Sequence, residues 1–557
     1  MPRLRIFNTY RTLRRSREIL SVLIKYGFED VVNALTSRTI SKIRFRRKIK
    51  QVETLSRPQR LRLAFEELGT TFIKFGQILS TRSDILPKEY ISEFEKFQDS
   101  VTPFDFSEVE KIILKEFGKE KDLIFLELES TPIASASIAQ VHKAKLKSGE
   151  VVAVKIQRPH IEQRINEDIL ILMELSKLLE KYLPESKIYR PVELVHQFEK
   201  IIKRELDFIL EARSIDKFRI NFKDDPAVFI PQVFWKYTTP KILTTEFIDG
   251  IKITDIESIE ANNLDKKIIA ENGARLILKE IFDYCFFHGD PHPGNLFVLK
   301  NNVIAAIDFG IIGRLDVNTV EQIKIIIYGL TENNVEKILS ALTAMNIIDE
   351  EMNDPSLKFD LMEYVDFYAG AELQHIDVKN AMNDFIQIIH NHHLALPIEL
   401  SLMGKVLVVS EGVGRLLDPT FNMIEYLKPY VIDWKWKSMN PFSHIKDFTE
   451  FTEDFSDLAK TFPNDLKDIL KRIRKGKVTV NLEHKGLERL MNEINRSSNR
   501  LSFALIVAAL IVGSSLIMQL QIGPFVFGFP LLGFIGYLFA AILGIWLLVS
   551  ILRTGKL

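Results

Sequence analysis

The chain has 557 residues, a length that allows several domains with sizeable hydrophobic cores. Lys plus Arg and Asp plus Glu both total 74, so the chain as a whole is neither basic nor acidic. The single cysteine, Cys285, excludes an intrachain disulfide and fits a reducing compartment.

The charges are unevenly distributed along the chain. Residues 1–60 carry 16 Lys and Arg against 4 Asp and Glu, and the remainder is therefore net acidic. A basic start on an acidic chain favours contact with an anionic surface, either membrane lipid or nucleic acid, and the alternative is a solvated helical face. Residues 1–20 lack the apolar core of a signal peptide, and Glu18 argues against a mitochondrial transit peptide. We predict a basic N-terminal helical segment over residues 1–56.

The pattern then changes from helix to strand and back to helix. Residues 57–121 have the spacing of a helical extension, and residues 122–250 contain short β-rich runs and two long helices, over 163–183 and 191–219. Residues 251–475 are mostly helical. A small strand-rich N-lobe followed by a larger helical C-lobe is the order of elements in protein kinases. The predicted fold class is therefore α+β, with a protein-kinase-like bilobal fold.

The C-terminal region has the composition of a membrane anchor. No charged residue occurs over 501–552, and one span needs roughly 20 apolar residues, so two spans fit. Gly523 and Pro524 interrupt the run near its middle. We predict a two-helix transmembrane hairpin, after a basic juxtamembrane linker over 476–500. Basic residues on both flanks place both ends in the cytoplasm.

Small residues recur every fourth position in this hairpin. They are Gly536, Ala540 and Gly544 in the second helix, and Ala504 and Ala508 in the first. Small residues at this spacing let membrane helices approach closely. The contact could lie within the hairpin or between protomers, and the sequence leaves both open.

The most informative motif runs from His288 to Asn295 and continues at Asp308. It sets the Asp290 carboxylate five residues before the Asn295 amide, with Asp308 thirteen residues further on. Kinases place an Asp at the transferring phosphate and hold Mg²⁺ with an Asn and a second Asp, which are hard oxygen donors. We predict Asp290 as the catalytic carboxylate, Asn295 and Asp308 as Mg²⁺ ligands, and ATP or ADP as the nucleotide. His288 and His292 are interpreted as ordering the backbone.

Two further motifs lie upstream. Residues 151–155 form a strand ending in Lys155, which could reach nucleotide phosphates, and the alternative is a surface lysine on an edge strand. Residues 134–139 match the spacing G-x-G-x-x-G with alanine at each glycine position, so the loop should be stiffer. The predicted nucleotide-binding residues of this loop are Ala134, Ser135, Ala136, Ser137, Ile138 and Ala139. An ordinary turn is the alternative.

Lys155 needs a carboxylate partner, because a buried lysine is costly unless it is paired. Kinases supply a glutamate from a helix. Glu199 and Glu205 are both candidates, with Asp207 nearby, and the pattern of residues does not choose between them. A solvent-facing charged helix is the bland interpretation.

Over about 55–555, these features resemble the UbiB family of atypical kinase-like proteins. The resemblance is carried by Lys74-x-Gly76-Gln77, by the alanine loop with Gln140-Val141-His142, by Glu205-x-Asp207 and by the His288–Asn295 motif. The C-terminal hairpin looks like the bacterial branch. Many members have glycine where Ala139 stands, so this chain departs from the family pattern at that position.

The resemblance implies roles for individual residues. Lys155 would contact the phosphates and pair with Glu199, and Asp290 would be the catalytic-loop aspartate. The helix bearing Lys74, Gly76 and Gln77 would fold over the active site and contact the Glu205 and Asp207 region as a regulatory element. That extension would occlude a protein substrate.

The implied function is a membrane-anchored ATPase of the bacterial inner membrane, multi-pass, with its kinase-like domain in the cytoplasm. It would support biosynthesis of ubiquinone or a related polyprenyl lipid, and would not phosphorylate proteins in trans. The expected partners are the lipid bilayer, a polyprenyl quinone precursor or other isoprenoid lipid, and other quinone-biosynthesis proteins. A homodimer is possible.

Three alternatives compete with this function. The first is a small-molecule phosphotransferase, which shares a His-Gly-Asp…Asn loop but not the Lys74 motif. The second is a non-catalytic scaffold switched by nucleotide. The third is nucleic-acid binding through residues 1–60, which we do not expect because aromatic residues are not interleaved with the basic ones there.

Overall fold

The computed structural model of the protein describes most of the chain. The described residues are 2–35, 55–82, 84–97, 101–182, 189–349, 354–369, 377–427, 429–430, 487–520, 524–526 and 529–553. The basic run over 38–50, the predicted C-lobe beyond 430 and the linker up to 486 lie outside them. The chain divides into two compact units, residues 1–443 and residues 444–557, and each is taken by itself.

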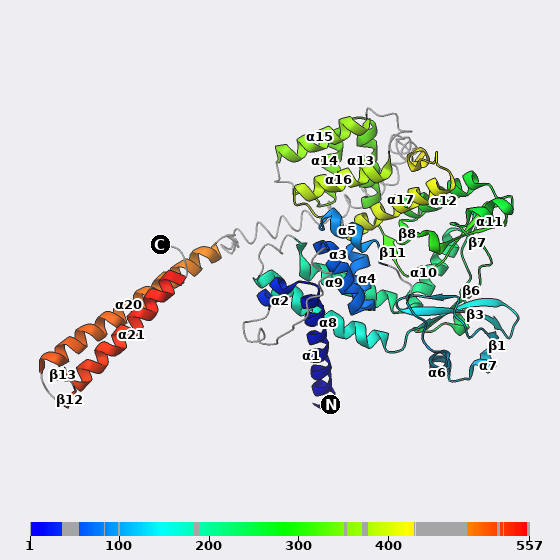
Figure 1. Cartoon of the computed structure of the whole chain (residues 1–557). Coiled ribbons are helices and arrows are strands. Elements are labelled where there is room, and N and C mark those ends of the chain that lie inside the picture. Colours follow the sequence, from blue (N-terminus) through cyan, green and yellow to red (C-terminus); the bar gives the residue numbers. More distant parts are fainter. Residues whose placement is uncertain are drawn as a thin grey trace, which may run out of the picture. The chain divides into compact units, whose positions relative to one another are not determined.

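The first unit begins with a group of helices (Figure 1). They are α1 (Pro2–Lys25), α2 (Glu29–Leu35), α3 (Arg57–Leu68), α4 (Thr70–Leu79) and α5 (Lys88–Phe94). Arg15 anchors α1, because its guanidinium bonds Asp168 on α8 (Ile161–Tyr182) at 2.7 Å and the Leu68 carbonyl at 2.8 Å. Asp168 is fully buried, so this ion pair holds α1 against the helices that follow it.

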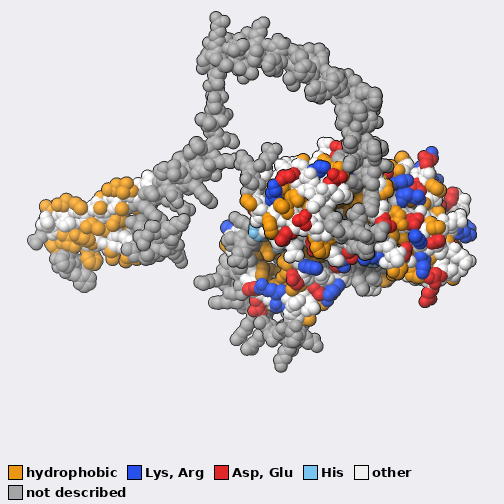
Figure 2. Space-filling model, turned by 90° about the horizontal axis from the view of Figure 1, so that it is seen from above, with side chains coloured by type: hydrophobic (Ala, Val, Ile, Leu, Met, Phe, Trp, Pro, Cys, Tyr) orange, Lys and Arg blue, Asp and Glu red, His pale blue; other side chains and the backbone are white. Residues whose placement is uncertain are grey.

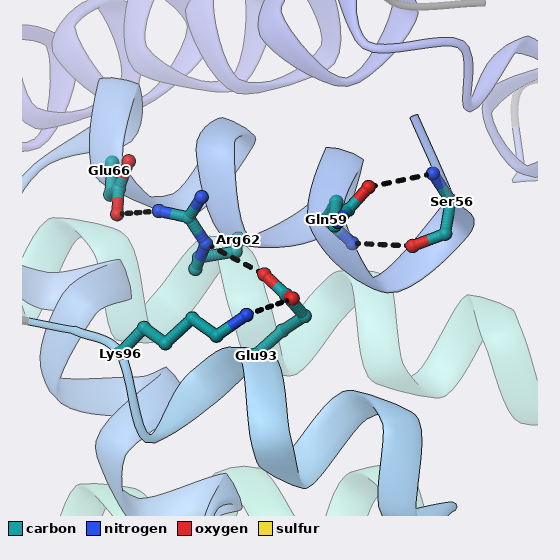
Figure 3. A network of polar contacts seen from close by, with 6 residues as sticks. All are labelled: Ser56, Gln59, Arg62, Glu66, Glu93 and Lys96. Atoms are coloured by element: carbon teal, nitrogen blue, oxygen red, sulfur yellow. Dashed lines mark hydrogen bonds and ion pairs between the residues drawn. The ribbon is translucent and has the colours of Figure 1, made fainter. Parts of the chain in front are cut away.

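A polar network joins α3 to α5 (Figure 3). Ser56 caps the start of α3 with a capping box. The Ser56 hydroxyl accepts a hydrogen bond from the backbone N–H of Gln59, and the side-chain oxygen of Gln59 accepts one from the backbone N–H of Ser56. Arg62 bonds Glu66 one turn along α3 and reaches Glu93 on α5 at 3.0 Å. The two helices therefore hold each other by charge as well as by their apolar faces.

The strand-rich lobe is an antiparallel sheet in the order β1-β3-β4-β6, with β2 paired to β3. Its strands are β1 (Phe125–Leu128), β2 (Ala134–Ser135), β3 (Ala139–Leu146), β4 (Val151–Gln157) and β6 (Ile242–Glu246). Val152, Val154 and Ile156 alternate along β4 and are fully buried, facing α6 (Phe106–Phe117) and α7 (Lys121–Ile124). Lys155 consequently points to the other face, toward the cluster described below.

Three helices pack beside this sheet: α8, α9 (Pro191–Glu205) and α10 (Phe208–Asn221). Every third or fourth residue of α9 is buried, from Leu194 through Phe198 and Ile202 to Glu205. Helix α9 then ends before Leu206. Asp207 caps the start of α10 by accepting a hydrogen bond from Ile209 N at 3.0 Å. The break separates two helices that the sequence reads as one.

The helical lobe contains two small sheets. One has the order β5-β10-β9-β7 and the other pairs β11 with β8. Its strands are β5 (Val228–Phe229), β7 (Ile251–Lys252), β8 (Phe286–His288), β9 (Leu296–Leu299), β10 (Val303–Ala306) and β11 (Ile312–Arg314). Short 3₁₀ turns lie at η4 (Pro293–Asn295) and η5 (Lys300–Asn302), and a third, η3 (Trp235–Tyr237), lies against β6 in the strand-rich lobe.

Helices surround these sheets. They are α11 (Ile256–Ala261), α12 (Lys266–Phe282), α13 (Val317–Thr331), α14 (Val335–Ala344), α15 (Pro355–Ala369), α16 (Val378–Asn391) and α17 (Ile398–Leu417). The α17 residue Glu411 accepts from Val378 N at 3.1 Å, and an added Cβ at Gly414 would lie 2.3 Å from the Phe421 ring. Near the end of α17, Glu411 therefore anchors the start of α16, and Gly414 allows the close packing of Phe421.

The second unit is a helical hairpin of α20 (Leu487–Leu520) and α21 (Leu531–Arg553). Its tip pairs β12 (Phe525–Val526) with β13 (Phe529–Pro530). Apolar side chains cover much of its visible described surface, whereas charges are spread over the first unit (Figure 2). By length and composition, one described helix, Leu501–Leu520, could cross a membrane, and Leu531–Trp546 is a shorter apolar helix.

Small residues bring the two helices together inside this hairpin. An added Cβ at Gly536 would lie 2.0 Å from Ser514 Oγ, and Ala540 is buried. An added Cβ at Gly544 meets nothing within 4 Å in the described part of the unit. Two of the three predicted small residues of α21 thus serve the contact within the hairpin. The α+β, kinase-like fold class is confirmed; crossing of a bilayer by both helices stays a prediction.

Candidate active site

Lys155 lies at the centre of a charged cluster between the two lobes. Its Nζ is 2.8 and 3.0 Å from the two carboxylate oxygens of Glu211, and 2.9 Å from Asp308 Oδ1. Pairing of β4 with β3 and β6 fixes the lysine opposite Val141 and Leu243. Burial alone would lower the pKa of Lys155, because it disfavours the ammonium ion. The negative charges of Asp308 and Glu211 have the larger, opposite effect and raise this pKa, so Lys155 stays protonated.

Glu211 was not predicted as the partner of this lysine. It lies one turn into α10, four residues after the capping Asp207, and is buried. The predicted pairing of Lys155 with Glu199 is wrong: Glu199 is 29% exposed on α9 and accepts from Lys203 at 2.5 Å. The signal that could have found Glu211 is the Leu206-Asp207 break, because Asp207 marks the start of a separate helix.

Exchanging each glutamate for glutamine separates the two assignments. Glu211→Gln should lower nucleotide turnover by at least about tenfold, because the neutral amide holds the Lys155 ammonium less firmly than a carboxylate does. Glu199→Gln loses only a half-exposed ion pair and should leave turnover unchanged. Phosphate release by the two purified variants is the measurement, and equal losses would contradict the assignment.

Burial also affects Glu211 itself. Desolvation raises the pKa of this carboxyl to about 7, although Lys155 acts in the opposite direction, and Asp308 adds to the rise. Asp308 differs, because the positive charge of Lys155 lowers its pKa well below the ordinary value. Of the two carboxyl groups that bond Lys155, the Asp308 group is therefore the one that is firmly ionised.

The Asp290 loop is held by a closed set of hydrogen bonds. His288 Nδ1 accepts from Asp290 N at 3.0 Å, and its Nε2 lies 3.0 Å from the Ile307 carbonyl. Asn295 Nδ2 donates to the Asp290 carbonyl at 3.1 Å, and Ile307 N donates to the Asn295 carbonyl at 2.9 Å. The predicted catalytic and metal-binding residues of the two motifs are thus brought together by hydrogen bonds to the loop backbone, most of them from the His288 and Asn295 side chains.

His292 orders the same loop, because its Nδ1 accepts from Gly294 N at 3.1 Å at the start of η4. This contact and those of His288 agree with the predicted backbone-ordering roles of the two histidines.

Asp308 has a geometry suited to a cation ligand. Its side chain is 48% exposed, and its φ of +59° is left-handed, a conformation that Asp and Asn tolerate best after glycine. Since the Asn295 amide nitrogen donates to Asp290, the amide oxygen is the atom that could face a cation. Among the described residues no group of three His, Cys, Asp or Glu side chains forms a metal site, and Mg²⁺ bound with phosphates needs only one or two carboxylates. The donor set therefore fits Mg²⁺ bound together with a nucleotide.

The motif containing Lys74 contacts this cluster. Lys74 Nζ on α4 lies 2.8 Å from Glu205 Oε1, and both side chains are 9% exposed. An added Cβ at Gly310, next to Asp308, would lie 3.6 Å from Glu205 Cγ. The predicted contact between Lys74 and Glu205 is confirmed, while Asp207 acts as a helix cap.

Gly76 has a packing role in this arrangement, whereas Gln77 contributes a backbone hydrogen bond. An added Cβ at Gly76 would lie 2.2 Å from the Phe97 ring, so only glycine allows this approach. The Gln77 carbonyl accepts from Ser80 Oγ at 2.7 Å near the end of α4. A regulatory role for these residues stays a prediction.

The alanine loop is tied to the strand beside it. Ala134 and Ser135 form β2, and Ala136 N donates to the Ala139 carbonyl at 2.8 Å. Arg158, which directly follows β4, holds the loop by donating hydrogen bonds to the Ala136 carbonyl at 2.9 Å and to Ser135 Oγ at 2.8 Å. The loop also contributes to the core, because Ser137, Ile138 and Ala139 are buried. These contacts agree with a stiff loop, and its binding of nucleotide stays a prediction.

Comparison with known proteins places the chain in a family. Residues 96–342 match the ABC1 atypical kinase-like domain, residues 361–422 the UbiB helical domain, and residues 485–553 the ABC1/UbiB kinase-like C-terminal domain. A Clostridium pasteurianum protein, described as an uncharacterized protein in the hydrogenase 1 5′ region, is 35% identical over 98% of this chain and 99% of its own length.

The chain is also similar to bacterial proteins named probable protein kinase UbiB. The probable protein kinase UbiB of Pseudomonas fluorescens is 32% identical over 83% of this chain and 87% of its own. A solved structure, the complex of Rv3197 with erythromycin from Mycobacterium tuberculosis, aligns over 62% of this chain and 87% of that one, with 23% identity and a TM-score of 0.43. On the domain matches and the UbiB relatives, the chain belongs to the ABC1/UbiB family of atypical kinase-like proteins.

Proposed function

We propose that the protein is a membrane-anchored, kinase-like ATPase that supports the biosynthesis of ubiquinone or a related polyprenyl lipid. The observation that carries the proposal is the bonding of Lys155 to Glu211 and Asp308 beside the Asp290 loop. Phosphoryl transfer in kinases needs a lysine–glutamate ion pair and, beside it, an aspartate that holds Mg²⁺, and Lys155, Glu211 and Asp308 would supply these three groups. Family membership supports the link with ubiquinone.

The residues of the cluster have distinct tasks in this proposal. Lys155 would hold the nucleotide phosphates and Glu211 would fix the lysine. Asn295 and Asp308 would hold Mg²⁺, which supplies positive charge to the phosphate oxygens when bound. Asp290 would orient the attacking water or hydroxyl, because the loop that carries it is fixed by His288 and Asn295.

The Lys74–Glu205 pair supports hydrolysis or small-molecule transfer over protein phosphorylation. The pair is buried directly against Gly310 and the Asp308 loop. In this proposal the α4 extension would occlude a protein substrate beside the cluster, as the resemblance to the UbiB family implies. Access by a large substrate would require separating this buried ion pair, which is energetically costly.

The hairpin supports the membrane part of the proposal. Both of its helices expose large apolar side chains, including Leu505, Leu516, Phe539 and Trp546. We assign it to the bacterial inner membrane as a multi-pass anchor with the kinase-like domain in the cytoplasm. Its partners would be the bilayer and a polyprenyl quinone precursor, which is apolar and resides in that bilayer, together with other proteins of quinone biosynthesis.

One observation favours a second candidate function. The direct ion pair between Lys155 and Asp308 occupies a carboxylate that a metal ion would need. A scaffold that binds nucleotide as a switch, without turning it over, would use the same residues. The two candidates differ only in whether phosphate is released.

The test is phosphate release from Mg-ATP by the full-length protein, with and without anionic vesicles and with EDTA as the blank. We expect release that EDTA abolishes and that vesicles increase, because the chain carries an apolar hairpin. Nucleotide binding without release would favour the scaffold. Release indifferent to vesicles and to quinone-like phenols would contradict the membrane-coupled function.

A further inference from the structure

Glu280 is a buried carboxyl group outside the charged cluster. It lies near the end of α12 with 1% of its surface exposed. Its Oε2 accepts from His288 N at 3.0 Å, across the turn that joins α12 to β8. Burial raises the pKa of Glu280 to about 8, so the group is largely an uncharged acid at neutral pH. An uncharged acid can both accept and donate a hydrogen bond.

The residue that Glu280 holds is the junction of the two catalytic motifs. The His288 ring accepts from Asp290 N through Nδ1, so the ring proton is on Nε2 and is donated to the Ile307 carbonyl. Ile307 directly precedes Asp308, and His288 is two residues before Asp290. A displacement of the His288 backbone would therefore move both carboxylates.

We propose that Glu280 is a positioning residue for the reaction, which sets the separation of Asp290 and Asp308 through its hydrogen bond to the His288 backbone. The inference rests on the proposed function and extends it. A carboxyl group is costly to bury, and an apolar residue would fill the same space without that cost. Its hydrogen bond to this backbone position is the feature that a purely structural filler would lack.

Two substitutions isolate the hydrogen bond. Glu280→Met keeps the length of the side chain but removes the acceptor, whereas Glu280→Gln keeps an acceptor and a donor without charge. We expect Glu280→Met to lower kcat about 10- to 100-fold, because small misplacements of catalytic groups have effects of that size. Glu280→Gln should retain kcat within about threefold, because it restores the bond of an uncharged acid. The KM for Mg-ATP should change less than kcat in both variants.

Glu411 provides the matched control. It is also a buried glutamate, 3% exposed, that accepts from a backbone amide, but it lies on α17, bonds Val378 N and also pairs with Arg415. Glu411→Met, which also breaks the pair with Arg415, should lower the melting temperature at least as much as Glu280→Met while leaving kcat per folded molecule unchanged. Equal kcat losses at the two positions, an unchanged kcat in Glu280→Met, or a failure of Glu280→Gln to retain kcat would each overturn the proposal.

Two further measurements keep the inference testable. If Glu280→Met does not fold, Glu280→Asp shortens the reach by one methylene, and we expect a partial loss of kcat with the fold retained; an unchanged kcat would overturn the proposal. If the wild-type protein releases no phosphate above the EDTA blank, the proposed function fails on its own account. The affinity for Mg-ADP then decides: Glu280→Met should weaken it at least about threefold relative to Glu411→Met, and equal affinities would overturn the inference.

Discussion

Asp308→Asn should abolish phosphate release from Mg-ATP while leaving the protein folded. An amide is a weaker ligand than a carboxylate for a hard cation, so Mg²⁺ would lose its principal charged ligand. Loss of an outer-shell partner costs about 10- to 100-fold in metal affinity or activity, and loss of a direct ligand should exceed that. Lys155 would keep its bonds to Glu211, and asparagine tolerates the left-handed backbone of residue 308 as well as aspartate does.

The matched control for this prediction is Asp316→Asn. Asp316 caps α13 by accepting from Thr319 N at 2.9 Å, and asparagine caps helices about as well as aspartate. The same chemical change eight residues away should therefore leave phosphate release unaltered. Release by Asp308→Asn at the rate of Asp316→Asn would show that Asp308 is not a metal ligand.

The local motifs of the site are readable from the sequence because each works through short-range chemistry. Asp290 and Asn295 lie in one loop that closes on itself through the Asn295 side chain, so their spacing alone carries their proximity. Asp308 joins them because β9 and β10 are adjacent antiparallel strands, with Ala306 opposite Leu296. A chain reversal of this kind is predictable from a pair of short strands with polar residues between them.

The partner of Lys155 was not readable for the opposite reason. Glu199, Glu205 and Glu211 differ little in their local surroundings, and the choice depends on where one helix ends and another begins. Helix boundaries are the least certain part of a sequence-based assignment. The sequence pattern over 191–219 is that of one continuous helix, which does not reveal the Asp207 cap, and Glu199 is a partly exposed residue that pairs with Lys203.

Close packing was also beyond the sequence. The Phe97 ring lies over Gly76, and Ser514 lies against Gly536, in each case because glycine has no Cβ. Glycine positions are visible in a sequence, but the side chain that fills the space comes from a distant segment. The family resemblance supplied the contact between Lys74 and Glu205, which pattern and spacing alone did not indicate.

Lys74→Met should destabilise the first unit by about 3–5 kcal/mol, because it leaves the Glu205 carboxylate buried without its cation. Lys74 Nζ and Glu205 Oε1 are 2.8 Å apart with both side chains 9% exposed, so water replaces little of the lost interaction. Glu205 Oε2 has no hydrogen-bond partner among the described residues, which makes the carboxylate dependent on this lysine. Thermal and denaturant unfolding of the solubilised protein would measure the loss.

Lys203→Met on α9 is the control, since Lys203 also pairs with a glutamate, Glu199, but with its side chain 53% exposed. The exposed pair should contribute no more than about 1 kcal/mol. Equal destabilisation by Lys74→Met and Lys203→Met would show that burial of the Lys74 pair has no energetic consequence.

The double variant Lys74→Met/Glu205→Met decides what the pair is for. Well-packed apolar residues often replace a buried ion pair without loss, so the double variant should recover most of the stability lost by Lys74→Met. A double variant as stable as the wild type, but with altered turnover of Mg-ATP, would mean that the pair controls the site beside Gly310 and Asp308. If stability and turnover both return to wild-type values, the regulatory role predicted for Lys74 would be excluded.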